Sequence, residues 1–122
     1  MIRTQGLTHI HLVVRDLERS LRFYQDVFGM EERFRDGPGT VFLNTPGSQD
    51  LITLNEDAAN AELAGASGGV VHFGFRLADS TDLDTAIETV EAAGGKLIRR
   101  GEHAPGEPFA YVEDPDGYVI EF

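Results

Sequence analysis

The sequence contains no cysteine, and this absence excludes several classes of protein. A disulfide-stabilised scaffold, a thiol nucleophile and a cysteine-ligated metal site are all ruled out. Any metal must therefore be bound by His, Asp or Glu side chains. The absence is also compatible with a reducing compartment, where disulfides do not persist.

Basic residues and long apolar runs are scarce as well. Ten Lys and Arg stand against 21 Asp and Glu, so the formal charge is −11 and the chain repels nucleic acid and anionic membrane surfaces. No apolar stretch approaches the about 18 residues that span a bilayer, and the first residues begin no signal-like region. We therefore expect a cytoplasmic protein that binds neither nucleic acid nor membrane. Its 122 residues predict a single domain.

The first half of the chain does contain a clear order of elements. The β-branched stretch 8–14 predicts a strand, and apolar residues spaced at i, i+4, i+7 and i+11 from Leu17 predict a helix. Asp16 is a candidate N-cap for this helix, and Gly29 is placed to end it. Three further strands are predicted near residues 32–35, 40–44 and 50–55.

The second half repeats this order after an alanine- and glycine-rich linker. A strand is predicted at 70–77, and Thr81 and Asp84 predict a capping box that opens a helix. Strands are then predicted at 96–100, 108–113 and 118–122. The sequence therefore predicts an α+β fold of two βαβββ modules. They cover about residues 7–57 and 70–122, with the linker at about 58–69.

Two histidines occupy matched positions in the two halves. His9 lies seven residues before Asp16 and His72 lies seven residues before Asp79, and each aspartate closes the first strand of its half. At the other end of each half, the last strands align so that one further pair of residues is equivalent. The four matched slots are filled by His9, Thr53, His72 and Glu121.

Strand parity predicts where these side chains point. Successive side chains of a strand face opposite sides of its sheet, and the apolar ones should pack on the helix. In the last strand, Ile120 and Phe122 take the helix side and leave Glu121 on the other. The same argument leaves His9 and His72 on the side without a helix. All three polar side chains are therefore predicted on one helix-free face.

Two imidazoles and one carboxylate form a ligand set that leaves coordination positions open on a divalent metal. A single strand histidine is more often a hydrogen-bonded residue than a ligand. Histidine makes up only 4 of 122 residues, however, so its recurrence in a matched slot favours metal binding. An open position can polarise a substrate oxygen, lower the pKa of bound water or bind dioxygen. We predict a site for Fe(II), Mn(II), Ni(II) or Zn(II), among which the ligand set does not decide.

Three stretches of the chain resemble the vicinal oxygen chelate superfamily, which includes glyoxalase I, extradiol dioxygenases, fosfomycin-resistance thiol transferases and bleomycin-resistance proteins. They are THIHLVVRDLERSLRFYQDVFGM at 8–30, VVHFGFRLAD at 70–79 and AYVEDPDGYVIEF at 110–122. The resemblance implies a cup-shaped mixed sheet around a metal that chelates vicinal oxygens of a small-molecule substrate. It puts His9, His72 and Glu121 at the ligand positions. It also implies a homodimer in which one chain gives the first histidine and its partner gives the other two ligands.

Thr53 departs from the family pattern. Glyoxalase I generally has a carboxylate ligand in this slot, and a threonine hydroxyl is a weak substitute. The three-ligand pattern is more like extradiol dioxygenases and the fosfomycin thiol transferases, although ring-cleaving dioxygenases usually carry four modules. Dioxygenase, lyase and isomerase chemistry therefore all stay open. The main rival hypothesis is a metal-free binding protein of the bleomycin-resistance type, and a third is a glyoxalase-like regulatory domain.

Five further residues are candidates for the site. His11 shares the face of His9 and could be a catalytic proton carrier or one more polar residue lining a wet cup. Arg76 could bind an anionic substrate group or pair with a surface carboxylate. His103 belongs to a loop that could cover the mouth of the cup. Thr53 and Tyr111 complete the candidate substrate-binding residues, and core packing is the alternative role for Tyr111.

Overall fold

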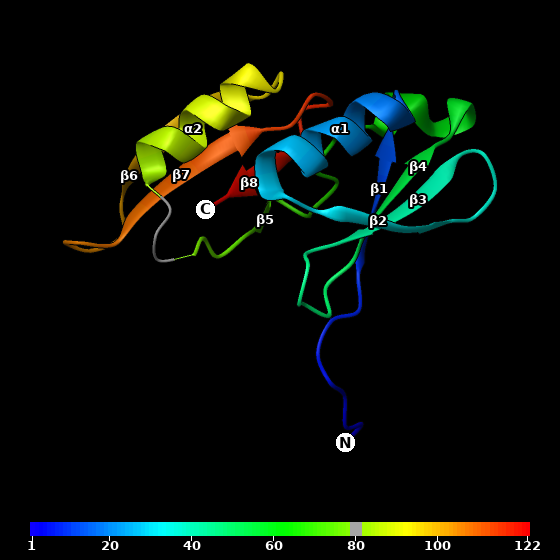
Figure 1. Ribbon diagram of the computed structural model, residues 1–122, viewed down its shortest axis with the longest axis horizontal. Helices are drawn as coiled ribbons and strands as arrows, with labels where there is room; N and C mark the ends of the chain where they lie inside the picture. The colour runs from blue at the N-terminus through cyan, green and yellow to red at the C-terminus, as the bar shows by residue number, and fades with distance from the viewer. Residues whose placement is uncertain (79–81) are drawn as a thin grey trace.

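The chain forms two four-stranded mixed sheets (Figure 1). The computed structural model describes residues 1–78 and 82–122. The first sheet has the order β1-β4-β3-β2, formed by β1 (Ile10–Val14), β2 (Glu31–Arg35), β3 (Thr40–Asn44) and β4 (Ile52–Glu56). The second has the order β5-β8-β7-β6, formed by β5 (Phe73–Gly74), β6 (Lys96–Glu102), β7 (Pro108–Glu113) and β8 (Val119–Glu121). The α+β fold predicted from the repeat is confirmed.

Two α-helices lie on the same side of the two sheets (Figure 1). The helix α1 (Leu17–Phe28) begins at Asp16, whose side chain accepts a hydrogen bond from the backbone N–H of Arg19, and ends at Gly29 with φ 65°. Both predicted ends of this helix are confirmed. The second helix, α2 (Leu83–Ala92), has Asp82 as its N-cap. The linker contains a short 3₁₀ helix, η1 (Ala58–Leu63).

Two residues of the second-half predictions, Asp79 and Thr81, lie outside the described residues. The N-cap bond that the structure shows runs from the backbone N–H of Thr85 to the Asp82 carboxylate, at 3.2 Å. In the part of the chain that is described, no helix combines the length and the apolar character needed to cross a bilayer.

The strand predicted at 70–77 is wrong in its length. Only Phe73 and Gly74 pair with β8, which itself has three residues and therefore offers little backbone to pair with. The strand predicted at 8–14 likewise begins two residues later, at Ile10. As a result, His9 and His72 both lie immediately outside the strands on which they were expected, each one residue before the first paired position.

The hydrophobic core lies between the helices and the sheets. Leu12, Val14 and Ile120 are buried there, while His9 and His11 on the opposite face are exposed. Phe73 and Phe75 pack against the same core from the second half, and their rings contact each other at a centroid separation of 6.2 Å. The predicted parity of β1, β5 and β8 is therefore confirmed, and His9 and His11 lie on the face away from the core.

The two sheets repeat each other in register. In the first sheet, β1 runs parallel to β4 with His11 opposite Thr53, and in the second, β5 runs parallel to β8 with Gly74 opposite Glu121. The equivalence of Thr53 and Glu121 that was read from the sequence is confirmed. Both sheets also carry a bulge at the matching place, between Glu32 and Phe34 in β2 and between Leu97 and Arg99 in β6. The strand order, register and bulge of the second module thus match those of the first, although β5 has two residues and β1 has five.

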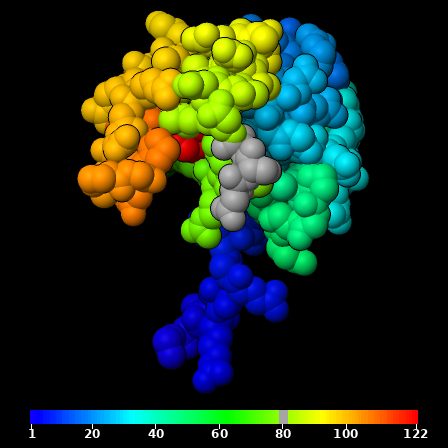
Figure 2. Space-filling view, turned by 60° about the vertical axis from the view of Figure 1, so that its left-hand side comes forward, coloured from blue at the N-terminus to red at the C-terminus, as the bar shows by residue number. Residues whose placement is uncertain are grey.

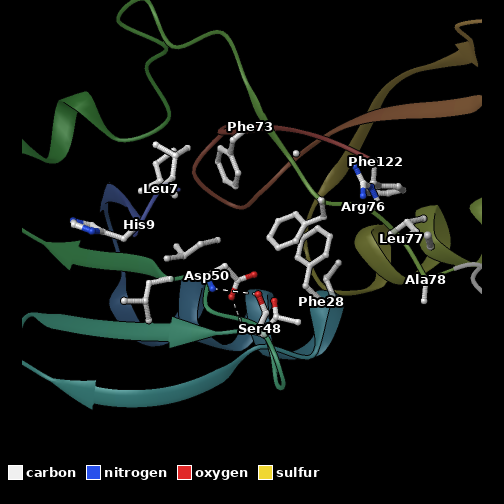
Figure 3. Close-up of a pocket in the computed structure, with 18 of the residues that line it drawn as sticks. Leu7, His9, Phe28, Ser48, Asp50, Phe73, Arg76, Leu77, Ala78 and Phe122 are labelled. Carbon is white, nitrogen blue, oxygen red and sulfur yellow. Dashed lines mark hydrogen bonds between the residues drawn. The ribbon is translucent and has the colours of Figure 1, made fainter. Parts of the chain in front are cut away.

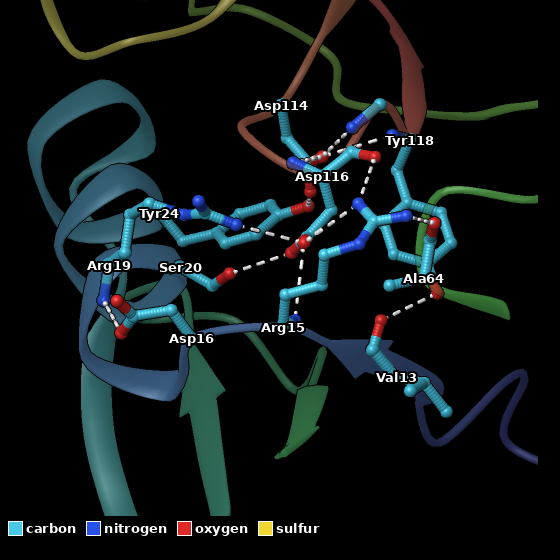
Figure 4. A network of polar contacts seen from close by, with 11 residues as sticks. Val13, Arg15, Asp16, Arg19, Ser20, Tyr24, Ala64, Asp114, Asp116 and Tyr118 are labelled. Atoms are coloured by element: carbon cyan, nitrogen blue, oxygen red, sulfur yellow. Dashed lines mark hydrogen bonds and ion pairs between the residues drawn. The ribbon is translucent and has the colours of Figure 1, made fainter. Parts of the chain in front are cut away.

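The turn between β7 and β8 binds the first module through a buried polar network (Figure 4). The side chain of Asp116 is 0% exposed and accepts hydrogen bonds from the Arg15 backbone N–H, Arg19 Nη2 and Ser20 Oγ at 3.2, 3.0 and 3.1 Å. The neighbouring Asp114 accepts a 2.7 Å bond from the Tyr24 hydroxyl. Because burial disfavours a charge, the pKa of the Asp114 carboxyl is raised.

Candidate functional site

Glu121 lies at the centre of a polar cluster on the helix-free face of the second sheet. Its Oε2 is 3.1 Å from Nε2 of His72, and its Oε1 is 2.7 Å from Nε2 of His103. The hydrogen bond from His103, and then the positive charge that His103 and His72 can carry, hold the pKa of the Glu121 carboxyl below its usual value. Two imidazole nitrogens thus converge on one carboxylate whose side chain is 23% exposed.

Aromatic rings hold the two histidines in place. The His72 ring meets Tyr111 edge to face with centroids 5.0 Å apart, and the His103 ring stacks on Phe109 at 4.3 Å. His103 stands just past the end of β6, where its backbone N–H donates to the carbonyl of Glu107 and closes the hairpin. The prediction that His103 belongs to a loop is confirmed. The structure adds that its side chain contacts Glu121 while more than half of it stays exposed.

The first predicted ligand, His9, is not brought to this cluster within one chain. It borders a cavity of about 780 Å³ between the modules, on the side opposite Arg76 (Figure 3). Within residues 1–78 and 82–122, no group of three or more His, Asp or Glu side chains is arranged to hold a metal ion. A single chain therefore presents two of the three predicted ligands together, and the third apart from them.

Three other predicted residues occupy different surroundings. His11 is exposed and borders a second cavity, of about 340 Å³, together with His72. Thr53 is only 1% exposed, and its hydroxyl has no hydrogen-bond partner among the residues that the structure describes. Tyr111 is half-buried on the helix-free face, opposite Glu121 in the β7–β8 ladder, so it is not a core residue.

Two residues of the cluster, Arg99 and Phe109, were not among the sequence candidates. The guanidinium of Arg99 lies 5.3 Å from the centroid of the Tyr111 ring and 5.5 Å from that of Phe109. Such a position over ring faces is favourable for a cation. The helix-free face of the second sheet therefore combines nitrogen and oxygen donors, groups that can exchange protons, and one fixed positive charge.

The comparison with known proteins agrees with this architecture. A model of the glyoxalase/bleomycin resistance protein/dioxygenase superfamily matches residues 6–122. The chain belongs to this superfamily. A lactoylglutathione lyase of Neisseria meningitidis serogroup A is 38% identical over 127 residues, covering 95% of this chain and 88% of that protein. The catechol-2,3-dioxygenase of Bacillus subtilis is 35% identical over 118 residues, covering 93% of this chain and 40% of that protein.

A solved structure with a similar sequence length has the same fold. It is a fosfomycin resistance protein of Listeria monocytogenes in complex with Mn(II) and 1S,2S-dihydroxypropylphosphonic acid. The match has a TM-score of 0.77, with 24% identity over 98% of this chain and 89% of that one. At this identity the likeness concerns the fold, and the superfamily relatives include both lyase and dioxygenase activities.

Proposed function

We propose that this superfamily member is a divalent-metal-dependent enzyme acting on a small substrate with vicinal oxygens. In the proposed site, His72 and Glu121 of one chain and His9 of a second copy hold the metal. The observation that carries the proposal is the pair of His72 Nε2 and Glu121 Oε2, which lie 3.1 Å apart on the helix-free face. A histidine nitrogen and a carboxylate oxygen are a donor pair suited to a catalytic divalent metal.

The residues present fit such an ion. The side chains of His72 and Glu121 are 33% and 23% exposed, so both donors are partly buried and still reach the surface. His72 lines the 340 Å³ cavity, which leaves room beside it. A bound metal would supply Lewis acidity that polarises a chelated substrate oxygen.

The edges of the two sheets support a site shared between two copies. The edge strands β1 and β5 each pair on one side only, and His9 and His72 lie at their starts. Apolar side chains near these edges are exposed, including Leu7, Val70 and Val71. Contact of β1 in one copy with β5 in the other would bury them and bring His9 toward the second copy's cluster.

His103 is the proposed proton carrier of the site. It bonds the Glu121 oxygen that His72 does not use, and its side chain is 55% exposed, so the ring can meet a substrate. An imidazole can accept a proton at one ring nitrogen and donate one from the other, and the contact with Glu121 holds the ring in place for this role. Stacking on Phe109 fixes the plane of the ring at the position where it would act.

Metal analysis of mixed variants tests the shared site. We expect near-stoichiometric divalent metal in the wild-type protein and almost none in His9→Ala or His72→Ala. When the two variants are unfolded, mixed and refolded together, half of the dimers are mixed and each has one intact site, so about a quarter of the wild-type metal should return. A mixture that stays empty would mean that each site lies within one chain. A wild-type protein that stays empty with Fe(II), Mn(II), Ni(II) and Zn(II) would favour the metal-free binding protein instead.

Two observations favour different reaction types. The buried neutral Thr53 leaves three ligands, which favours dioxygenase chemistry on a ring-borne vicinal diol. The lyase relatives favour lyase or isomerase chemistry instead. Oxygen consumption by Fe(II)-loaded protein with 4-methylcatechol would support the first. Turnover of the hemithioacetal of methylglyoxal and glutathione by Ni(II)- or Zn(II)-loaded protein, with no oxygen uptake by the iron form, would support the second.

A further inference from the structure

Three side chains form a row across the helix-free face of the second sheet. Glu121 on β8 is opposite Tyr111 on β7, and Tyr111 is in turn opposite Arg99 on β6. Residues that pair directly in antiparallel strands share a face, so the row begins at the proposed metal ligand and ends at a cation. Neighbouring strands are spaced about 4.8 Å apart, so the two ends of the row lie about 10 Å apart.

A β-bulge brings Arg99 onto this face. Leu97 lies opposite the core residue Val112, and strict alternation would return Arg99 to the core side with it. The register shift between Leu97 and Arg99 inserts Ile98 as an extra residue, which is 47% exposed. Bulges commonly re-aim a side chain next to an active site. Here the bulge turns the guanidinium toward Tyr111.

Arg99 differs from the ion-paired arginines of the chain in what it contacts. Arg19 binds Asp116, Arg35 binds Glu18 and Glu32, and Arg100 binds Asp84. In residues 1–78 and 82–122, Arg99 makes no ion pair, and its guanidinium lies over the faces of Tyr111 and Phe109 instead. Ring faces fix the plane of a guanidinium without using its N–H groups, so these donors remain available to a planar anion.

We propose that Arg99 binds a carboxylate group of the substrate and thereby sets the specificity of the site. The assignment rests on the proposed function, because the vicinal oxygens of the same substrate would lie at the Glu121 end of the row. One aromatic ring with substituents at both ends fits the distance between them. The surface is hollowed between the β6–β7 hairpin (orange) and the segment that leads into β5 (green), with β8 (red) at the back (Figure 2). The proposed substrate class is therefore a ring-borne vicinal diol with a carboxylate on the far side of the ring.

A matched pair of probes tests the assignment. Zinc-loaded wild-type protein is titrated with 3,4-dihydroxybenzoate and with 4-methylcatechol, which differ in a carboxylate and a methyl group. We expect Arg99→Gln to weaken binding of 3,4-dihydroxybenzoate roughly 10- to 100-fold, because a charge-assisted hydrogen bond is lost. Binding of 4-methylcatechol should not change. Arg100→Gln removes the same charge one residue away, where the side chain binds Asp84, and should change both affinities less than about threefold.

A second measurement separates this inference from the metal site. In metal-free protein, the side-chain Nε resonance of Arg99 should shift on addition of benzoate and not of benzyl alcohol. A response to benzoate with no binding of either diol to the zinc form would keep the Arg99 assignment and contradict the proposed function. If Arg99→Gln binds each diol as tightly as the wild-type protein does, the Arg99 assignment is contradicted and the proposed function is kept. If benzoate leaves the Arg99 resonance unmoved, the assignment is overturned whatever the metal does.

Discussion

The two modules share one backbone plan and carry different chemistry on it. At matched positions of the helix-free faces, the first sheet has Thr53, Phe42 and Phe34 where the second has Glu121, Tyr111 and Arg99. In the first, Phe34 stacks on Phe42 at 4.3 Å with a small angle between the rings, which makes an apolar wall. In the second, the same row is ionic at both ends. Equivalence of position in a repeat therefore does not imply equivalence of role.

The turns before β4 and β8 also carry different side chains at matched positions. The second-module turn carries Asp114 and Asp116, which bind residues of α1 and the end of β1. In the matched register, Ser48 stands where Asp116 does, and its backbone N–H donates within its own turn to the carbonyl of Thr45. The second module thus supplies the contacts that join the halves, and the first supplies the helix that receives them.

The largest expected effect concerns the matched slots of Thr53 and Glu121. Glu121→Gln keeps the shape of the side chain and removes its negative charge. Metal affinity should fall at least about 100-fold, since loss of an outer-shell partner alone costs about 10- to 100-fold. Competition with a chromophoric chelator measures this change. Thr53→Val serves as the control and should leave the metal affinity unaltered, because the hydroxyl is buried away from the cluster. A loss of metal in Thr53→Val would show that the Thr53 hydroxyl is itself a ligand.

The second expected effect tests whether the two turns differ in stability. Asp116→Ala should lower the free energy of unfolding by about 2–3 kcal/mol, less than for a fully buried ion pair because Arg15 and Arg19 are 47% and 40% exposed. Ser48→Ala, at the matched position, should change it by less than about 0.5 kcal/mol. Urea unfolding of the metal-free protein, with the protein concentration held fixed, measures both changes. Similar losses in the two variants would contradict the asymmetry between the turns.

The third expected effect has the opposite sign. The Thr53 hydroxyl is buried with no partner among the described residues, and burial of an unpaired hydroxyl costs free energy. Thr53→Val removes that cost and should raise the free energy of unfolding by about 1 kcal/mol. In the same sheet, Thr40 accepts a 2.9 Å bond from the side chain of Asn55, so Thr40→Val should lower it by about 1 kcal/mol. Equal changes in the two variants would contradict this reading of Thr53.

The sequence predicted the fold and the register of the site well, for physical reasons. Helix stripes and caps are local signals, and the spacing of Asp16 and Gly29 was enough to bound α1. Parity then assigned the faces of β1 and β8 because one side of each sheet is covered by a helix. The length of β5 failed because strand pairing depends on the partner, and β8 offers three residues.

The contacts of the site were less predictable than its face. Arg99 was missed because a bulge reverses the parity of β6 in its middle, and no local pattern in the sequence marks the extra residue. The contact of His103 with Glu121 depends on how far the hairpin projects, which is a property of the packed sheet. A histidine beyond the end of a strand that leads into a Pro- and Gly-containing turn was the available signal, and it indicated only a loop.

The smallest expected effect separates burial from hydrogen bonding at Asp114. Burial raises the pKa of this carboxyl, although Oδ1 accepts backbone bonds from Asp116, Gly117 and Tyr118 at 2.9, 3.0 and 3.0 Å. The folded protein thus binds this proton more tightly than the unfolded chain does. The contribution of the protonated Asp114 carboxyl to stability is complete below the unfolded pKa of about 3.9 and is lost as the pH rises through the folded pKa.

Asp114→Asn keeps an oxygen for the three backbone bonds and cannot ionise, so the free energy of unfolding of the variant relative to wild type should increase with pH across that window and then level off. Subtracting the wild-type curve removes the opposite slope from Glu121, whose lowered pKa favours folding at higher pH. Urea unfolding between about pH 3.5 and 7 measures the difference. A difference that falls with pH would mean that the hydrogen bonds from the turn outweigh burial, and that the turn binds a carboxylate more strongly than an amide.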